Sequence, residues 1–213
     1  MTKPSEALSR RRFLGYAGAV AGVAAIAAAC NKNDDPMPDS GVNLGSGDVG
    51  ILNYAFALEQ LEAAFYIQVA MTPYSGITAA ETALLTDIRD HEIAHRELFK
   101  TALGASAITT LEFNFSTIDF SKRESVLGTA KAFEDLGVSA YNGAGKLIVN
   151  PDYLVLAGKI VSVEARHAAY IRDLISNGSF ADNTVIDMNG LDTSRMPSEV
   201  LAAAGAYIKT KIN

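Results

Sequence analysis

The sequence predicts an all-α protein: a four-helix bundle with one long crossover between its second and third helices, and a short extra helix near the C-terminus. In four long stretches, apolar residues recur every three or four positions, as expected for helices that bury one face. Short breaks rich in Gly, Pro and Asn separate the first stretch from the second and the third from the fourth. The chain has 213 residues, of which 49% are hydrophobic, and this is enough for one sizeable core. We therefore expect one bundle over residues 50–176 and an extension over residues 177–213.

The first predicted helix covers Ile51–Met71, a stretch with neither Pro nor Gly. A break at residues 72–76 ends it, and a connection this short places the next helix antiparallel beside it. Thr78 and Glu81 have the spacing of a capping box, which predicts the start of the second helix. Gly104 predicts the end of that helix.

Residues 104–120 break the helical pattern, because β-branched and aromatic residues become frequent there. We expect an extended crossover along the bundle rather than a sheet. A crossover of this length can travel the full height of the bundle, so the third helix need not be antiparallel to the second. Ser121 and Glu124 again have the spacing of a capping box and predict the start of the third helix.

The fourth helix is predicted from its N-terminal signals, an N-cap at Asn150 followed by Pro151 at the first helical position. It should stop at Asn177 and Gly178, which open an irregular segment rich in Asp, Asn and Gly. Beyond this segment, a short Ala-rich helix is expected from Pro197 to about residue 206. We expect this helix to pack on the end of the bundle without a chemical role.

Glutamates occupy the middle of the apolar stripe in each of the four helices, and they follow a repeat. The first and third helices each carry Glu-x6-Tyr, and the second and fourth each carry Glu-x-x-His. The residues are Glu59 and Tyr66, Glu92 and His95, Glu134 and Tyr141, and Glu164 and His167. Three residues span just under one helical turn, so the Glu and His of each Glu-x-x-His motif share a helix face. The order of the motifs indicates a duplicated helix pair.

Four buried glutamates near one another require neutralisation. An unpaired buried carboxylate costs several kcal/mol, and four of them would also repel one another. Either they are protonated, with raised pKa values, or cations neutralise them. Two divalent cations would supply four positive charges, and two imidazoles would complete the ligand set. Oxygen-rich sites with imidazole suit iron or manganese better than structural zinc. The pattern also matches the known arrangement of di-metal carboxylate bundles.

The chain resembles bacterial ferritin-like domain proteins, in the branch that includes desiccation-related proteins, over roughly residues 50–176. The segments that carry the resemblance are residues 58–66, residues 90–95, Glu134 and residues 163–170. The resemblance implies a ferritin-like bundle that holds two iron or manganese ions. The implied ligands are Glu59, Glu92, His95, Glu134, Glu164 and His167, with Glu92 and Glu164 as the bridging pair. This ligand set is similar to that of bacterioferritin.

Rubrerythrins usually carry a further Glu one turn past the third-helix ligand, and here that position is Gly137. The chain also lacks the Cys pairs of a rubredoxin module, because it contains one Cys. These departures disfavour a rubrerythrin-type peroxidase with a built-in electron donor.

Four residues near the motifs have open roles. Glu62 is either an additional ligand, or one that contacts a ligand, or a partly exposed acid. His91 differs from its neighbour Glu92 by about 100° around the helix, so we expect a surface role or a contact with a ligand. Tyr66 and Tyr141 either fill the core or act at the site, by hydrogen bonding to ligand carboxylates or by relaying electrons.

The N-terminus predicts an export signal over residues 1–29. Residues 9–14, Ser-Arg-Arg-Arg-Phe-Leu, fit the twin-arginine pattern S-R-R-x-F-L, and an Ala-, Gly- and Val-rich run follows. That run ends at Cys30, in a context similar to a bacterial lipoprotein cleavage site, although Ala27 stands where Leu is usual. We expect Cys30 to be lipidated and to anchor the protein to a membrane; the alternative is ordinary cleavage near the Ala run. Residues 30–49 are polar and predict a disordered tether.

Composition excludes several classes of protein. The net charge is −6, and the signal segment carries four of the basic groups, so the remainder is more acidic still. Nucleic acid is therefore not an expected partner, because phosphate binding needs a basic patch. One Cys permits neither a disulfide framework nor a Cys-based zinc site.

Together these features predict a di-metal protein of the periplasm or cell-envelope exterior, which oxidises Fe(II) or reduces O₂ or peroxide in stress protection. One alternative is a non-catalytic, desiccation-related structural protein of the envelope. Another is peroxide dismutation of the manganese-catalase type. A homodimer stays open, whereas a hollow storage shell is disfavoured for a lipid-tethered chain.

Overall fold

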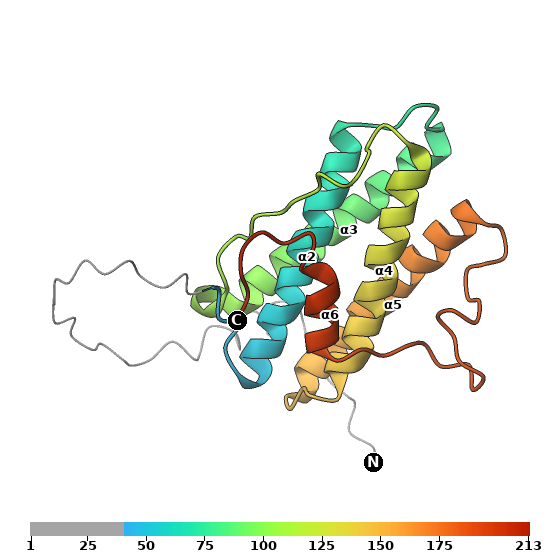
Figure 1. Cartoon of the computed structure of the whole chain (residues 1–213). Coiled ribbons are helices and arrows are strands. Elements are labelled where there is room, and N and C mark those ends of the chain that lie inside the picture. The colour runs from blue at the N-terminus through green and yellow to red at the C-terminus, as the bar shows by residue number, and fades with distance from the viewer. Residues whose placement is uncertain (1–40) are drawn as a thin grey trace, which may run out of the picture.

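A computed structural model describes residues 41–213, and in it four long helices form a bundle (Figure 1). The helices are α2 (Gly47–Met71), α3 (Ala79–Leu103), α4 (Arg123–Gly145) and α5 (Pro151–Ile175), with a 3₁₀ turn at Gly104–Ser106 and a short α6 (Pro197–Ala204). The predicted all-α class and the four-helix bundle with an additional C-terminal helix are confirmed. The described residues contain isolated β-bridges but no strand. No helix among them is both long and apolar enough to cross a membrane.

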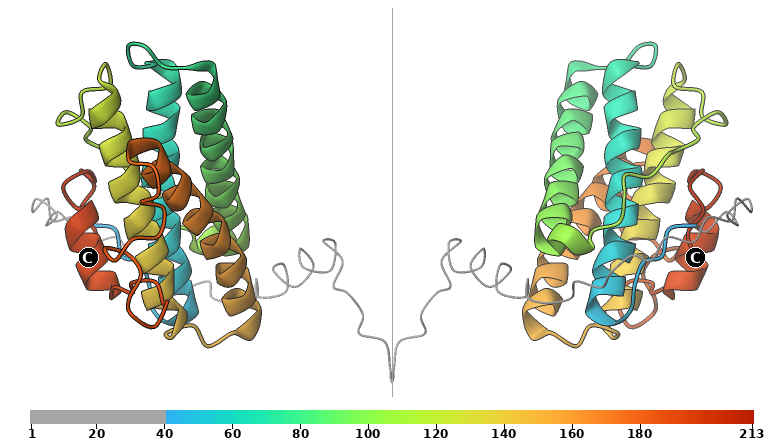
Figure 2. Two further views of the ribbon diagram at one scale, coloured as in Figure 1. Left: turned by 90° about the vertical axis from the view of Figure 1, so that its right-hand side faces the viewer. Right: turned by 90° about the vertical axis from the view of Figure 1, so that its left-hand side faces the viewer.

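The helices pack in two pairs, α2 with α3 and α4 with α5. A short turn joins the two helices of each pair, while the crossover joins the pairs. Figure 2 shows this crossover running along the bundle beside α2, from the end of α3 to the opposite end, where α4 begins. As a result α3 and α4 run in the same direction, which the sequence had left open.

The crossover is held by polar side chains of α2, a helix that is buried on nearly all sides. Asn53 donates to the carbonyl oxygens of Leu44 and Ser106, and its own oxygen accepts from the backbone N–H of Ile108. The oxygen of Gln60 accepts from the backbone N–H of Leu111 at 2.9 Å. The first part of the crossover therefore obtains backbone hydrogen bonds from α2, while Glu112 and Asn114 pair with the C-terminal segment.

Two predicted helix caps are confirmed and one is wrong. Thr78 and Glu81 form a reciprocal capping box at the start of α3. Ser121 does not cap α4, because its hydroxyl donates to Asp119 at 2.6 Å; the N-cap residue is Lys122, which makes no side-chain cap. The hydroxyl of Ser121, which the sequence pattern assigned to the helix cap, is thus used in the turn before α4. Asn150 caps α5 as predicted, accepting from the N–H of Asp152.

The structure differs from the expected tether at residues 41–49. The first bundle helix begins at Gly47, not Ile51, and Leu44 is buried. Val42 donates its N–H to the carbonyl oxygen of Lys211 at 2.7 Å, so the segment before α2 pairs with the C-terminal residues. The apolar side chains at 42 and 44 supply contacts that a purely polar tether would lack. The predicted signal segment, Cys30 and the start of the tether lie outside the described residues.

The irregular segment between α5 and α6 is tied to the bundle by Arg172. This buried guanidinium donates two hydrogen bonds to Asp135 of α4, at 2.8 and 2.9 Å, and contacts Asp182 and Thr184 of the segment. Gly143 of α4 lies against the backbone of Arg195, so closely that a Cβ there would overlap the carbonyl oxygen. Both contacts fix the extension on the α4–α5 pair.

Candidate metal centre

The six predicted ligands converge at the centre of the bundle. Glu59 comes from α2, Glu92 and His95 from α3, Glu134 from α4, and Glu164 and His167 from α5. All four glutamates are fully buried, and the exposed fraction of the histidine side chains is 12% for His95 and 5% for His167. Each residue lies well inside its helix, away from both ends, so regular helical backbone holds the side chains in place.

The ligand atoms form two overlapping groups. One contains Glu59, Glu92, His95 and Glu164, and the other contains Glu92, Glu134, Glu164 and His167. Within each group, one nitrogen or oxygen atom per residue lies within 4.8 Å of all the others. Glu92 and Glu164 belong to both groups, as expected for carboxylates that bridge two ions.

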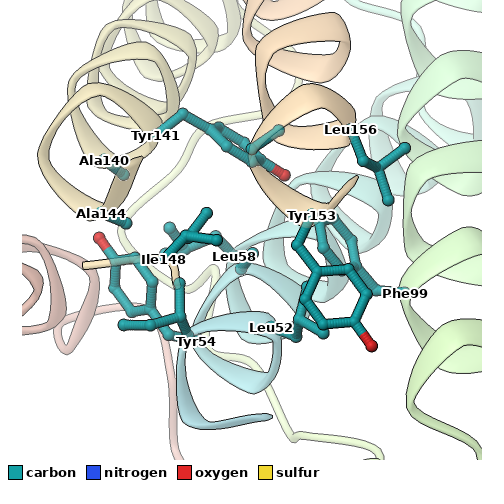
Figure 3. Close-up of a pocket in the computed structure, with 13 residues that line it drawn as sticks. Leu52, Tyr54, Leu58, Phe99, Ala140, Tyr141, Ala144, Ile148, Tyr153 and Leu156 are labelled. Atoms are coloured by element: carbon teal, nitrogen blue, oxygen red, sulfur yellow. The ribbon is translucent and has the colours of Figure 1, made fainter. Parts of the chain in front are cut away.

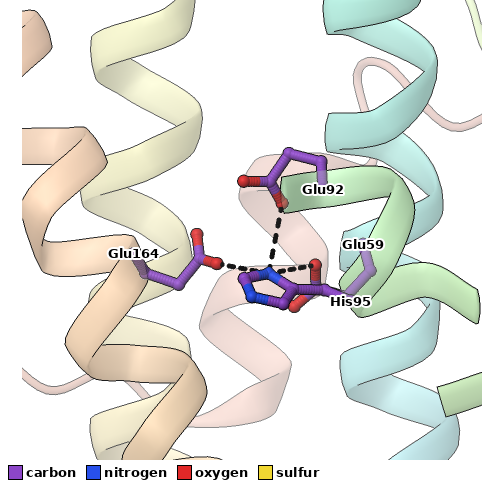
Figure 4. Close-up of side chains that lie close together, drawn as sticks. All are labelled: Glu59, Glu92, His95 and Glu164. Carbon is purple, nitrogen blue, oxygen red and sulfur yellow. Dashed lines mark ion pairs between the residues drawn. The ribbon is translucent and has the colours of Figure 1, made fainter. Parts of the chain in front are cut away.

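The two groups are related by the repeat seen in the sequence. Nδ1 of His95 lies 2.9 Å from Glu164 and 3.4 Å from Glu59 (Figure 4). Nδ1 of His167 lies 2.9 Å from Glu92 and 3.4 Å from Glu134. Each imidazole is therefore closest to the carboxylate of the opposite Glu-x-x-His motif, and the duplicated helix pairs build two near-equivalent half-sites.

The oxygen and nitrogen atoms of the cluster make few hydrogen bonds of good geometry with one another. Both oxygens of Glu92, both oxygens of Glu164 and Nδ1 of both histidines are buried without a hydrogen bond of acceptable geometry. Buried polar atoms are normally satisfied, so a cluster of unsatisfied ones at a single point calls for a missing partner. Carboxylate oxygens and imidazole nitrogens that converge at these distances are suited to metal ions. This buried cluster can hold metal ions, and its residues fit such a group.

The pKa shifts show how the cluster is neutralised when no metal is bound. Burial and the surrounding carboxylates raise the pKa of Glu164 well above its usual range, and burial raises the pKa of Glu59 to about 7. Burial also opposes ionisation of Glu92, but the nearby histidines hold its pKa at about 2. Burial disfavours charged imidazoles, yet the adjacent carboxylates raise the pKa of His95 to about 12 and that of His167 to about 10. Protons therefore neutralise the cluster in the absence of metal, and cations would have to displace them.

The two tyrosines of the Glu-x6-Tyr motifs contact carboxylates of the cluster across the α2–α4 interface. The hydroxyl of Tyr66 on α2 donates to Glu134 of α4 at 2.5 Å. The hydroxyl of Tyr141 on α4 donates to Glu59 of α2. Burial raises the pKa of both tyrosines well above the usual range, so both hydroxyls keep their protons and remain donors. Of the two roles left open by the sequence, the structure shows core packing combined with orientation of the carboxylates.

Glu62 is fully buried next to the cluster, and so is not a partly exposed acid. Burial, followed by the charges of the neighbouring carboxylates, raises its pKa well above the usual range. The carboxylate occupies space left by Gly137, since a Cβ at position 137 would lie 3.0 Å from Oε1 of Glu62 and 3.7 Å from Oε2 of Glu164. The sequence alone did not reveal this pairing, because the two residues are on different helices.

His91 also contacts the cluster, although its side chain is exposed in part. Its Nδ1 lies 2.9 Å from Nε2 of His167, and the two rings are stacked with centroids 5.2 Å apart. Nε2 of His167 can donate this hydrogen bond while Nδ1 faces Glu92 and Glu134. The contact is the one expected of an outer residue that fixes the tautomer and orientation of a metal-binding imidazole. The position of His91 around α3 directs its side chain to α5 rather than into the site. For this reason His91 does not belong to the apolar stripe that predicted the ligands.

Comparison with known proteins agrees with this geometry. A search of curated proteins found no significant match to the chain. A family model described as the ferritin-like domain matches residues 47–177, a range that begins with α2 and ends just after α5. The match covers all six converging residues and more than half of the chain. The protein therefore belongs to the ferritin-like domain family.

Proposed function

We propose that the protein is a di-metal carboxylate protein with two iron or manganese ions in the bundle. The ligands are Glu59, Glu92, His95, Glu134, Glu164 and His167. The observation that carries the proposal is that two four-residue groups share Glu92 and Glu164. Two separate mononuclear sites would not need shared carboxylates.

Charge supports two ions rather than one. Two divalent cations balance four ionised glutamates, whereas one would leave two negative charges in a buried site. The ligands are mostly carboxylate oxygens with one imidazole for each half-site, a mixture that suits iron and manganese. Glu62 is close enough to the cluster to serve as an additional carboxylate, because it faces Glu164 across the space at Gly137.

The activity we propose is oxidation of Fe(II) or reduction of O₂ or peroxide. A pair of redox-active ions, when bound, supplies the electron-transfer chemistry for such reactions. The chain itself would orient the ligand side chains and keep bulk water away from them. Tyr66 and Tyr141 hold Glu134 and Glu59 in orientation, His91 holds His167, and complete burial of the glutamates keeps bulk water away.

We further propose that the protein works in the periplasm or at the cell-envelope exterior in stress protection. The twin-arginine pattern at residues 9–14 and the cleavage-site context of Cys30 support export and a lipid anchor. Twin-arginine export carries folded proteins, so metal could be loaded before export. The acidic composition argues against nucleic acid as a partner.

Metal analysis of protein purified from its native compartment tests the proposal. We expect about two iron or manganese ions per chain, with both lost in a Glu92→Ala/Glu164→Ala variant. A matched control is Glu97→Ala/Glu124→Ala, which removes two exposed glutamates from α3 and α4 and should retain both ions. Metal-free protein whose melting temperature does not change when iron is added would refute the di-metal reading.

Kinetics then separates the activities. Stopped-flow oxidation of added Fe(II) distinguishes a redox protein from a non-catalytic structural protein of the envelope. Evolution of O₂ from hydrogen peroxide by manganese-loaded protein would identify the dismutation activity instead.

A further inference from the structure

Figure 3 shows an apolar pocket, whose lining includes residues of the first turns of α2. All four long helices line it, with side chains that include Leu52, Leu58, Phe99, Ala144 and Leu156. Tyr141 forms part of its wall, and the hydroxyl of this residue donates to Glu59. One side chain therefore separates the pocket from a predicted metal ligand.

The pocket offers little to a water molecule. Its lining is almost entirely apolar, and no charged residue contributes to it. The lining includes three tyrosines: the hydroxyl of Tyr141 donates to Glu59, that of Tyr54 is buried without a partner, and Tyr153 is partly exposed. An ordered water needs about two to four polar partners, and apolar cavities without them stay dry and accept xenon or other apolar molecules. The pocket is therefore suited to an apolar occupant.

Size narrows the class of occupant. The pocket includes about 410 Å³ of empty space when its open mouth is counted, but its enclosed part is only somewhat larger than one water molecule needs. An aromatic ring would have to displace side chains, whereas a diatomic gas would not. Hydrogen peroxide is small enough, but it donates and accepts several hydrogen bonds, and the only buried unpartnered group that the lining offers is the hydroxyl of Tyr54.

We propose that this pocket receives dioxygen and holds it beside the metal centre. The inference rests on the proposed function and deepens it, because it names O₂, rather than peroxide, as the oxidant that the pocket serves. O₂ is apolar, and its transfer from water into a dry, apolar site is favourable. Peroxide would have to reach the centre by another route.

Xenon tests the pocket independently of any metal chemistry. Metal-free protein is exposed to xenon, and the gas is located by crystallography under pressure or by xenon NMR. We expect xenon in the pocket of the wild type and its loss in Ala144→Leu, which fills the space from α4. The matched control is Ala169→Leu, an alanine of α5 that lines a second, more polar cavity together with Asp135 and Arg172. Absence of xenon from the wild-type pocket would overturn the proposal.

Single-turnover oxidation of bound Fe(II) tests the role of the pocket with O₂ and with hydrogen peroxide as separate oxidants. We expect Ala144→Leu to slow the reaction with O₂ several-fold and to leave the reaction with peroxide unchanged. Equal slowing of both, or of neither, overturns the proposal. Ala140→Val, a smaller change in the same wall, serves if Ala144→Leu fails to fold, as judged by its circular dichroism. If the wild type neither binds metal nor oxidises Fe(II), the proposed function fails, and the xenon result alone decides whether the pocket takes apolar gas.

Discussion

Replacement of His91 by Phe should weaken one metal site and spare the other. The structural reason is an asymmetry between the two half-sites. Nδ1 of His91 is 2.9 Å from Nε2 of His167, while the position that corresponds to His91 in the other half of the repeat is Val163, which cannot hydrogen bond to His95. Phe retains a ring that can stack on His167, so the variant removes the hydrogen bond and keeps most of the packing.

The size of the effect follows from the kind of contact. Loss of an outer hydrogen bond to a metal-binding imidazole typically costs about 10- to 100-fold in metal affinity. This corresponds to about 1.4–2.7 kcal/mol of binding free energy. The cost should fall on the half-site that contains His167, Glu134 and the two shared carboxylates. The half-site of His95 has no corresponding contact to lose.

Titration of metal-free protein with Co(II), followed by absorbance, measures the two sites separately. The wild type should take up two ions tightly, and His91→Phe should take up one tightly and one weakly. Val163→Ala is the matched control at the corresponding position of the other half and should bind both ions as the wild type does. If His91→Phe weakens both sites equally, or neither, then the contact between His91 and His167 does not support the metal centre.

Three further outcomes concern stability. Gly143→Ala should lower the free energy of unfolding by about 3 kcal/mol, because the new Cβ overlaps the carbonyl oxygen of Arg195. Gly128 has open space around it, so Gly128→Ala should raise the free energy of unfolding by up to about 1 kcal/mol. Urea denaturation measures both changes. Arg172→Ala should cost about 3 kcal/mol in the same assay, since it leaves Asp135 without its buried partner. Metal-free protein should lose stability as pH rises from about 6.5 to 10, because the folded state raises the pKa of His167 to about 10 and so binds protons that the unfolded chain releases. Metal affinity should rise over the same range, since metal displaces those protons. Melting curves check the first trend, and pH-stat titration checks the second. Stability of the metal-free protein that increases with pH would contradict the assignment of charged histidines.

Much of the fold and the site was predictable because both depend on helical periodicity. The spacing of Glu92 and His95, and its repetition at Glu164 and His167, is a property of a single helix face, and a sequence shows such faces directly. The crossover was predictable for the opposite reason, since residues 104–120 lack that period. The sequence could not show contacts between side chains of different helices, because these depend on how each helix is rotated about its axis and how closely the helices pack. The room that Gly137 leaves for Glu62 is one such contact, and the approach of His91 to His167 is another.

Local signals failed where a group outside the pattern supplied the decisive contact. Ser121 has the spacing of a helix cap, but Asp119, two residues earlier, accepts its hydroxyl hydrogen and leaves Lys122 as the N-cap residue. The segment before α2 has the composition of a tether, yet Val42 and Leu44 find apolar and backbone partners supplied by the far end of the chain. In the first case the competing partner is two residues away and lies outside the capping pattern, whereas in the second case it lies at the far end of the chain. The candidate metal centre was less affected, because each of its predicted ligands lies in mid-helix. There the backbone hydrogen bonds are already made, and only the direction of the side chain remains to be set.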